Sequence, residues 1–197
     1  MFTGIIRELG RISDRDSRGD GIVLTLSRPA AWSDLREGDS VAVNGACLTV
    51  LSLTDTVWQV RLMHETLAKT NLGDLAKGLA VNLERPVAAG ERFDGHFVLG
   101  HVDGVAAVAD ITEAGDDRIF RFIPPPTLLP YFIPKGSVAL NGVSLTIVEV
   151  GPDSFTVSIM PYTLDKTTFG ATRVGDRVNV EVDMIAKHLA RLITPAQ

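Results

Sequence analysis

Short runs in which apolar and polar residues alternate follow one another through most of the chain. The alternation is plain at 22–27, which reads IVLTLS, and at 155–160, which reads FTVSIM. This period-two pattern predicts strands with one buried face. In the first half, β-type runs occupy 3–12, 22–27, 40–43, 46–53, 57–63 and 79–84, with partners about 97 residues later. Short helical turns are expected at 29–36, at 126–133, and after Met63 and Met160.

The chain contains an internal repeat. SVAVNGACLTV at 40–50 returns as SVALNGVSLTI at 137–147, and two further segments recur at the same spacing of 97 residues. Between residues 40 and 84, 18 of 45 positions are identical to their partners. The spacing slips to 96 near the N-terminus, which indicates a length change in the polar stretch 13–20, expected to be a loop. A repeat of this length indicates a duplicated domain.

Each copy contains an Asn-Gly pair between β-rich flanks, at Asn44 and at Asn141. Asn-Gly tolerates positive φ at both turn centres, so each pair predicts a tight hairpin. Six short strands per copy favour a closed barrel, since closure leaves no exposed edge. We therefore expect an all-β fold of two tandem six-stranded antiparallel, Greek-key-like barrels. The expected units are 1–94 and 95–183, followed by a C-terminal helix and tail at 184–197.

The last segment has no counterpart in the first copy. Apolar residues recur at near-helical spacing from Met184 to Ile193, which predicts a short amphipathic helix. A helix of this length is marginal alone. It is expected to pack either on its own chain or on other subunits.

Composition narrows the function classes. The chain of 197 residues is 45% apolar and 22% charged, which is ordinary for a globular protein. A net charge of −5 without a basic tract argues against binding to nucleic acid, and no apolar run is long enough to span a membrane. The single cysteine excludes an internal disulfide. The N-terminus does not read as a secretory signal, so a cytoplasmic location is expected.

Positions at which the two copies differ are candidates for unequal roles. Cys47 corresponds to Ser144, and Ile5 corresponds to His101, whereas Thr49 and Thr146 match. Matched hydroxyls suit repeated hydrogen bonds to a polar ring, and an unmatched thiol and imidazole suit a reaction that treats two ligands differently. The plainer alternatives stay open at this point: a lone cysteine in a strand is usually a small buried apolar residue, and strand threonines are common structural residues. Without further ligands, a zinc site at His96 and His101 is not expected.

Six motifs in order give these observations a more specific meaning. They are MFTGII at 1–6, NGACLTV at 44–50, ETLAKTNLG at 65–73, GHFVLGHVDG at 95–104, KGSVALNGVSLT at 135–146 and TLDKTTFG at 163–170. Together they closely resemble the riboflavin synthase family of alpha-chain type, from residue 1 to about residue 185. The resemblance implies two similar barrels and a homotrimer assembled around the C-terminal helix.

The resemblance also implies a reaction. Two molecules of 6,7-dimethyl-8-ribityllumazine react by transfer of a four-carbon unit, which gives riboflavin and 5-amino-6-(D-ribitylamino)uracil. It implies a transferase without cofactor or metal, and an active site between the N-terminal barrel of one subunit and the C-terminal barrel of its neighbour. Each barrel is expected to bind one lumazine.

The resemblance also implies which residues form the site, at the positions where this chain matches the motifs of the family. The expected catalytic residues are Cys47, His101, Ser40 and Ser144. The first pocket is expected to contain Phe2, Gly4, Ile5, Ile6, Cys47, Leu48, Thr49, Arg61, Leu62, Met63, His64, Glu65 and Thr66. The second is expected to contain Gly100, His101, Val102, Lys135, Asn141, Ser144, Leu145, Thr146, Ser158, Ile159, Met160, Pro161, Tyr162 and Thr163.

Four positions depart from the family pattern, and one of them is Asp94, since the family often has Gly-Gly-His where this chain reads Asp94-Gly95-His96. Asn141 stands where many members have Asp, and Arg61 and Tyr162 also differ from the common residues. An asparagine cannot act as a carboxylate base, so no acid is expected to act there. The rival hypotheses are a relative that only binds lumazine or flavin, as an antenna protein does, and a barrel pair that only mediates protein interactions.

Overall fold

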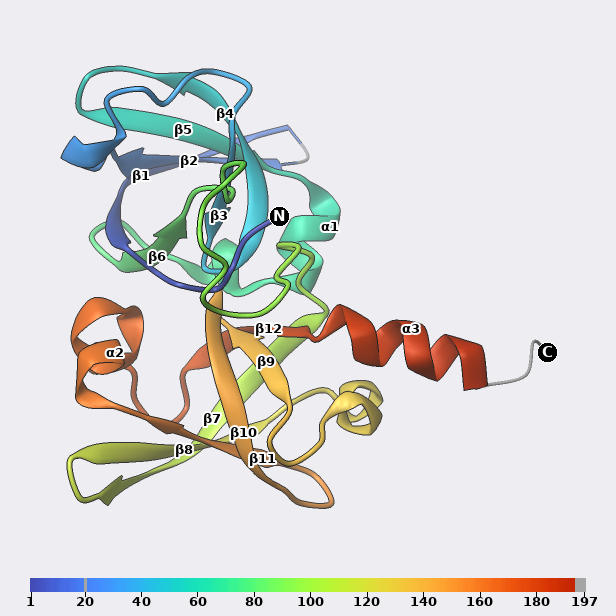
Figure 1. The fold of residues 1–197 in the computed structure, drawn as a ribbon. Helices are drawn as coiled ribbons and strands as arrows, with labels where there is room; N and C mark the ends of the chain where they lie inside the picture. Colours follow the sequence, from blue (N-terminus) through green and yellow to red (C-terminus); the bar gives the residue numbers. More distant parts are fainter. Residues whose placement is uncertain (20, 194–197) are drawn as a thin grey trace.

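The computed structural model describes residues 1–19 and 21–193, which fold into two closed six-stranded antiparallel barrels. The strand order is β1-β2-β5-β4-β3-β6 in the first barrel and the equivalent β7-β8-β11-β10-β9-β12 in the second. Figure 1 shows the two barrels stacked one on the other, with the last helix at one side. The all-β tandem-barrel prediction is confirmed.

The first barrel is built from β1 (Glu8–Arg18), β2 (Gly21–Ser27), β3 (Ser40–Val43), β4 (Ala46–Leu53), β5 (Val57–Leu62) and β6 (Ala80–Glu84). The second is built from β7 (Gly104–Ala114), β8 (Asp117–Ile123), β9 (Ser137–Leu140), β10 (Val143–Val150), β11 (Phe155–Ile159) and β12 (Arg177–Val182). The helices are η1 (Ala30–Trp32), α1 (His64–Lys69), η2 (Asn71–Asp74), η3 (Pro126–Tyr131), α2 (Pro161–Lys166), η4 (Thr168–Ala171) and α3 (Met184–Ile193). Helical turns therefore lie in the four places where the sequence predicts them.

The two Asn-Gly pairs form the tight hairpins between β3 and β4 and between β9 and β10, as predicted. Asn44 and Gly45 have φ of 44° and 79°, and Asn141 and Gly142 have φ of 46° and 79°. Both residues of each pair thus occupy the left-handed region that a two-residue hairpin turn of this type requires. The tips of the two hairpins meet where the barrels touch, so the turns also build the junction between the barrels.

The prediction for the first strand was wrong at both ends. Instead of a strand at 3–12 and a loop at 13–20, β1 begins at Glu8 and continues to Arg18, pairing with β2 through Arg15 opposite Leu24 and Ser17 opposite Ile22. A bulge after Ile12 bends the strand. A polar segment can form a strand where its ladder is satisfied by a neighbour, so polarity alone did not indicate a loop. Residues 3–7 leave the barrel.

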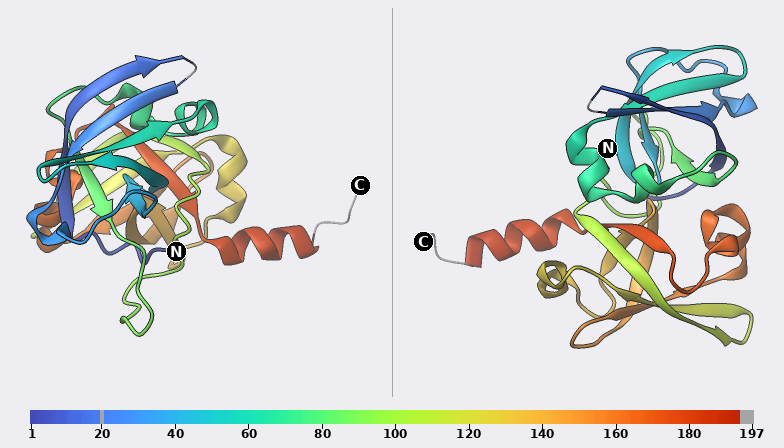
Figure 2. Two further views of the ribbon diagram at one scale, coloured as in Figure 1. Left: turned by 90° about the horizontal axis from the view of Figure 1, so that it is seen from above. Right: turned by 180° about the vertical axis from the view of Figure 1, so that it is seen from behind.

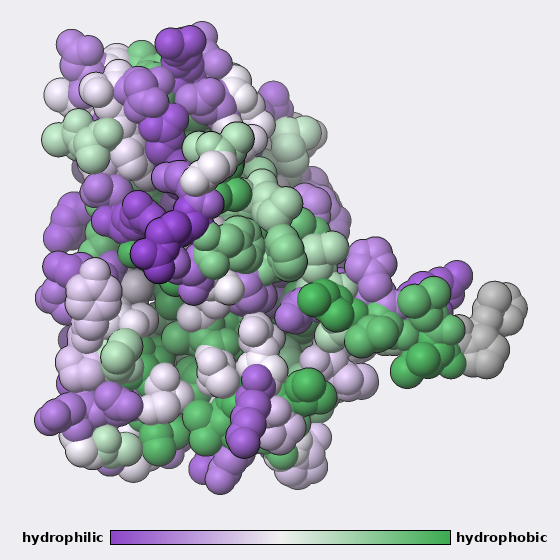
Figure 3. All heavy atoms as spheres, in the orientation of Figure 1, coloured by the Kyte–Doolittle hydropathy of each residue, from purple (hydrophilic) through white to green (hydrophobic). Residues whose placement is uncertain are grey.

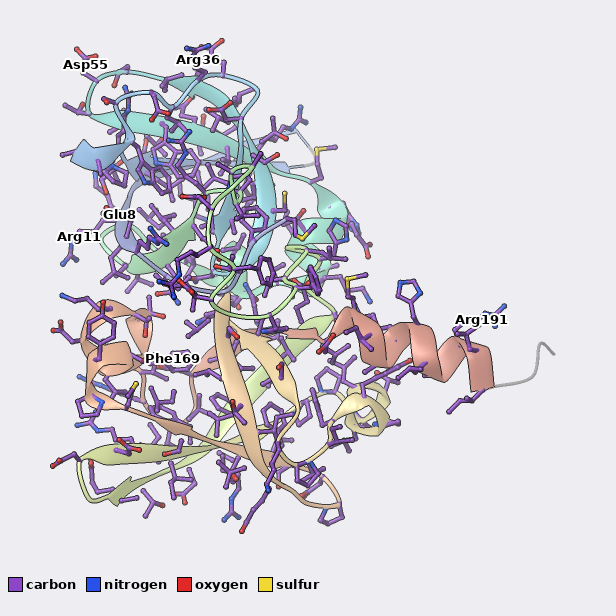
Figure 4. The ribbon with its side chains drawn as sticks, in the orientation of Figure 1. Glu8, Arg11, Arg36, Asp55, Phe169 and Arg191 are labelled. Carbon is purple, nitrogen blue, oxygen red and sulfur yellow. The ribbon has the colours of Figure 1, made fainter. Side chains whose placement is uncertain are left out.

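Each barrel has its own apolar core. Trp58, Leu24 and Leu26 are fully buried in the first barrel. In the second, Phe169 packs edge-on against Phe120 with ring centroids 5.5 Å apart, and Figure 4 shows it inside the lower barrel. Burial of each such side chain stabilises the fold by about 1.5–3 kcal/mol. Two separate cores explain how a repeat of this size folds as two similar barrels.

The last helix, α3, projects away from both barrels in every view (Figure 2). Apolar side chains gather on its surface in Figure 3, and Ile185, Leu189, Leu192 and Ile193 are all more than half exposed. At its base, the ammonium group of Lys187 lies 2.6 Å from a carboxylate oxygen of Asp103. Of the helices that the structure describes, none has the length and apolar character to cross a membrane.

Candidate functional site

Two extended segments cross at the junction between the barrels. We call residues 2–6 the first arm and residues 98–102 the second arm; each leads into the first strand of its own barrel. The arms pair with each other, since the backbone N–H of Phe2 donates to the carbonyl of Val98 at 2.8 Å and the reverse bond is 3.2 Å. Phe2 and Val98 are fully buried in a small cluster with Ala42 and Ala139, against which Cys47 packs. Because Ala42 belongs to the first barrel and Ala139 to the second, this cluster anchors both arms at the junction between the barrels.

The first arm lies on the second barrel. The N–H of Ser144 donates to the carbonyl of Gly4 at 2.8 Å. A Cβ on Gly4 would lie 2.6 Å from the Cβ of Ser144, so only glycine allows this approach. Ile6 is buried within the core of the second barrel. The first arm therefore forms part of the surroundings of Ser144.

The second arm lies on the first barrel in the same way. The N–H of Cys47 donates to the carbonyl of Gly100 at 2.9 Å, and a Cβ on Gly100 would lie 2.5 Å from the Cβ of Cys47. Val102 packs against the core of the first barrel. His101, between these residues, is exposed. The second arm thus brings an imidazole into the neighbourhood of Cys47.

This crossing corrects the grouping expected from the sequence. Gly4, Ile5 and Ile6 were predicted beside Cys47, and Gly100, His101 and Val102 beside Ser144, but each arm lies on the opposite barrel. The repeat shows which positions are equivalent, and equivalence holds whether each arm packs on its own barrel or on the other. As a result, His101 directly follows Gly100, the residue that lies against Cys47.

The first-barrel site is a pocket of about 400 Å³ on the outer face of β4 and β5. Of the predicted residues, its walls contain Cys47, Leu48, Thr49, Arg61, Met63 and Thr66. Ser40 is half-buried opposite Thr49 in the β3–β4 ladder. Leu62, by contrast, points into the barrel core, and His64 and Glu65 are exposed on α1. The pocket combines hydroxyls, a guanidinium and a thiol, which suits a polar ring with a hydroxylated chain.

The second-barrel site presents the equivalent strand and helix. Ser144, Leu145 and Thr146 lie on β10, and Ser158 and Ile159 lie on β11. The hydroxyl of Ser158 donates to a carboxylate oxygen of Asp117 at 3.2 Å, and Ile159 is buried in the core. Met160 precedes α2, which begins with Pro161, Tyr162 and Thr163, and Lys135 lies in the turn before β9 with φ of 67°. Tyr162 and Met160 are more than half exposed.

His96 is a candidate site residue that sequence reasoning considered only as a zinc ligand. Its Nδ1 lies 2.7 Å from the hydroxyl oxygen of Ser144. Burial lowers the pKa of His96, and the carboxylate of Asp183 acts in the opposite direction. Burial therefore favours the neutral form of this imidazole, which is bonded to a hydroxyl and can accept a proton. Its position just before the second arm was the one available signal.

Asn141 lies at the barrel junction, where four asparagines at equivalent positions link the barrels. The side-chain oxygen of Asn141 accepts from the N–H of Asn179 at 2.9 Å and from the side-chain amide of Asn71 at 3.2 Å. The amide of Asn82 donates across the junction to the carbonyl of Asn141, and that of Asn179 donates to the carbonyl of Asn44. Buried amides joined in this way specify one arrangement of the two barrels. The structure does not bring Asn141 together with the residues around Ser144.

Two buried carboxylates hold the arms. Glu84, at the end of β6, accepts hydrogen bonds from the N–H groups of Thr3 and Gly4. Glu181, at the equivalent position on β12, accepts from the N–H groups of Leu99 and Gly100. Burial raises the pKa of both carboxyl groups above the usual 4.5, against the lowering effect of these hydrogen bonds.

The raised pKa of Glu181 gives a testable pH dependence. In the window just above pH 4.5, the native chain binds more protons than the unfolded chain, so the free energy of unfolding falls as pH rises through the folded-state pKa. Glutamine does not titrate. We therefore expect the stability of the wild type relative to Glu181→Gln to decrease between about pH 4 and about pH 8. Urea unfolding over this range measures it, and a difference that is constant or that grows with pH would contradict the expectation.

Comparisons with known proteins agree with this geometry. The lumazine binding domain model matches residues 3–86 and 99–183, one copy for each arm and barrel. Riboflavin synthase of Bacillus subtilis is 43% identical over 100% of this chain and 91% of its own length. Riboflavin synthase of Mycobacterium tuberculosis is 42% identical, and both chains are covered in full.

Solved structures point the same way. The crystal structure of LumP complexed with riboflavin has a TM-score of 0.87 at 27% identity, covering 92% of this chain and 99% of LumP. LumP complexed with 6,7-dimethyl-8-(1'-D-ribityl) lumazine has a TM-score of 0.84, also at 27% identity and with the same coverage. The two matched domains, together with identity above 40% over the full chain, show the family to which the chain belongs. The chain is an enzyme that belongs to the riboflavin synthase family and carries two lumazine binding domains.

Proposed function

We propose that the chain converts two molecules of 6,7-dimethyl-8-ribityllumazine into riboflavin and 5-amino-6-(D-ribitylamino)uracil by transfer of a four-carbon unit. The observation that carries the proposal is the presence of two equivalent sites with unequal chemistry. One has Cys47 under the second arm, and the other has Ser144 bonded to His96 under the first arm. A reaction between two identical molecules needs two similar sites, and it also needs them to act differently.

The chemistry asks for proton transfer at one lumazine and nucleophilic addition at the other. A base removes a proton from the 7-methyl group of one molecule, and water or a thiolate adds at C7 of its partner. The neutral imidazole of His96 and the exposed imidazole of His101 are the groups suited to move protons. The hydroxyls of Thr49, Thr146 and Ser144 are donors suited to the ring carbonyls on which negative charge develops. All atoms of the two substrates are found in the two products, so the proposed reaction needs no cofactor.

We place the productive site between subunits of a homotrimer, with the first barrel of one chain facing the second barrel of its neighbour. Exposed apolar side chains at both sites support this arrangement: Leu51 and Met63 at the first, Met160 and Tyr162 at the second. The exposed apolar face of α3 supports assembly through this helix. The division into units 1–94, 95–183 and 184–197 is part of the same proposal.

The direct test is to incubate the pure protein with the lumazine alone and to follow flavin absorbance. Formation of riboflavin supports the proposal. Tight binding of one ligand per chain without flavin formation would favour a protein that only carries the ligand, and absence of both would favour an interaction module.

A substitution in the second arm probes the proton-transfer step. We expect His101→Gln to lower turnover by about 100-fold, the usual contribution of a positioned acid or base, and to leave lumazine affinity nearly unchanged. Asp55→Asn, in the exposed turn between β4 and β5, is the control and keeps wild-type turnover. Turnover in His101→Gln equal to that of Asp55→Asn would remove His101 from the mechanism.

A further inference from the structure

We infer that Glu84 and Glu181 are positioning residues that act on the opposite barrel: Glu84 of the first barrel sets the site around Ser144, and Glu181 of the second barrel sets the site around Cys47. The assignment of these surroundings as lumazine sites rests on the proposed function. The crossed action itself follows from hydrogen bonds and close contacts within one chain.

The first chain of contacts starts at Glu84, which is only 7% exposed. One of its carboxylate oxygens accepts from the N–H of Thr3 at 2.7 Å and from the hydroxyl of Thr3 at 2.8 Å. The N–H of Gly4 is shared between this oxygen at 3.2 Å and the other at 3.1 Å. The carbonyl of the same Gly4 accepts from the N–H of Ser144. A carboxylate of the first barrel is therefore two hydrogen bonds away from the strand that carries Ser144.

The second chain of contacts mirrors the first. Glu181 is 4% exposed, and its two oxygens accept separately from the N–H of Leu99 at 2.6 Å and from the N–H of Gly100 at 2.9 Å. The carbonyl of Gly100 accepts from the N–H of Cys47. A carboxylate of the second barrel thereby holds the second arm at a fixed distance from Cys47.

The bonding explains why a carboxylate stands here rather than an amide. Two successive N–H groups point at one side chain, and only a carboxylate offers two acceptor oxygens. In Glu181→Gln, an NH₂ group would face one of the two N–H donors, so the backbone N–H of either Leu99 or Gly100 would lose its acceptor. In Glu84→Gln, the remaining oxygen still accepts from both donors of Thr3. We expect the change at Glu181 to have the larger effect.

Cys47 provides a direct probe, because it is the only thiol in the chain and lies under the second arm. The experiment measures the rate at which a thiol reagent modifies Cys47 in the full-length protein without any ligand. We expect Glu181→Gln to raise the rate by about tenfold or more, since bonds to a charged group hold a segment closed by factors of this order. Glu84→Gln and the surface control Glu149→Gln are expected to stay close to the wild-type rate.

Ligand binding then tests the crossing. With 6,7-dimethyl-8-ribityllumazine as the probe, we expect Glu84→Gln to weaken binding at the second-barrel site while the ligand still protects Cys47 from modification. Glu181→Gln is expected to lose this protection and to retain the other ligand. A crystal structure of each variant with the same ligand identifies the site that has emptied.

Several results would overturn the inference. They are an unchanged Cys47 rate in Glu181→Gln, a faster rate in Glu84→Gln than in Glu181→Gln, or loss of ligand from the substituted residue's own barrel. If Glu181→Gln does not fold, Glu181→Asp keeps both oxygens but retracts them, and the same order of rates applies. The thiol measurement needs no substrate and no turnover, so it stands or falls separately from the proposed reaction.

Discussion

Replacing Gly45 with alanine is expected to lower the free energy of unfolding by about 3–5 kcal/mol, among the largest effects of any single substitution in this chain. Two causes add together. Gly45 has φ of 79°, where a side chain is strained. In addition, the new Cβ would lie 2.6 Å from the backbone nitrogen of Gly142 in the facing hairpin, and backbone cannot move aside cheaply. Chemical denaturation monitored by tryptophan fluorescence measures the loss.

Gly78→Ala separates the two causes. Gly78 has φ of 91°, but a Cβ there would meet nothing within 4 Å. This control is expected to lose only the cost of backbone strain, about 1–2 kcal/mol. If both variants lost the same amount, the close approach of the two hairpins would not contribute to stability, and the junction would depend on the asparagine network alone.

Disrupting the apolar face of α3 is expected to have the largest effect on activity. The double variant Leu189→Glu with Leu192→Glu places charges on the exposed face that we assign to the trimer contact. If the two reacting lumazines sit on different subunits, a separated chain holds one lumazine in each barrel, but neither faces its reaction partner. The advantage of holding two reactants together is then lost, so we expect turnover to fall by at least about 1,000-fold. Light scattering should show the particle mass falling from three chains to one.

Arg191→Glu is the matched control for this variant. Arg191 is exposed on the same helix (Figure 4) and is not among the apolar side chains that form the proposed contact. The control is expected to keep both mass and turnover. A fully active single chain in the double variant would show that the productive site does not need a second subunit.

The barrels were predictable because their signals are local. Alternation at 22–27 and the pairs at Asn44 and Asn141 depend on neighbours along the chain, and the structure has strands and hairpins there. β1 was not predictable at its ends, because its polar half gains its ladder from β2 and the preceding residues gain theirs from the other barrel. Pairing partners of this kind are not visible in the pattern of one segment.

Which candidate residues share a site was harder to predict. The repeat paired Cys47 with Ser144 as equivalent positions, which the structure supports. It could not show that Gly100 lies over Cys47 and Gly4 over Ser144, because an exchange between equivalent halves leaves the sequence pattern unchanged. His96 reaches Ser144 because its segment pairs with the first arm at Thr3, and the position of that arm on the second barrel was not visible in the sequence.

The crossed arms set an order of events during synthesis of the chain. Glu84 can engage Thr3 as soon as the first barrel is complete, but Ser144, the partner of Gly4, is still 60 residues away. At ordinary ribosomal speed this interval lasts roughly 3–12 s. Throughout it, Ile6 has no core to enter, because that core belongs to the unfinished half. The first arm is therefore among the last parts to settle, and a nascent chain leaves Ile6 exposed until translation is well advanced.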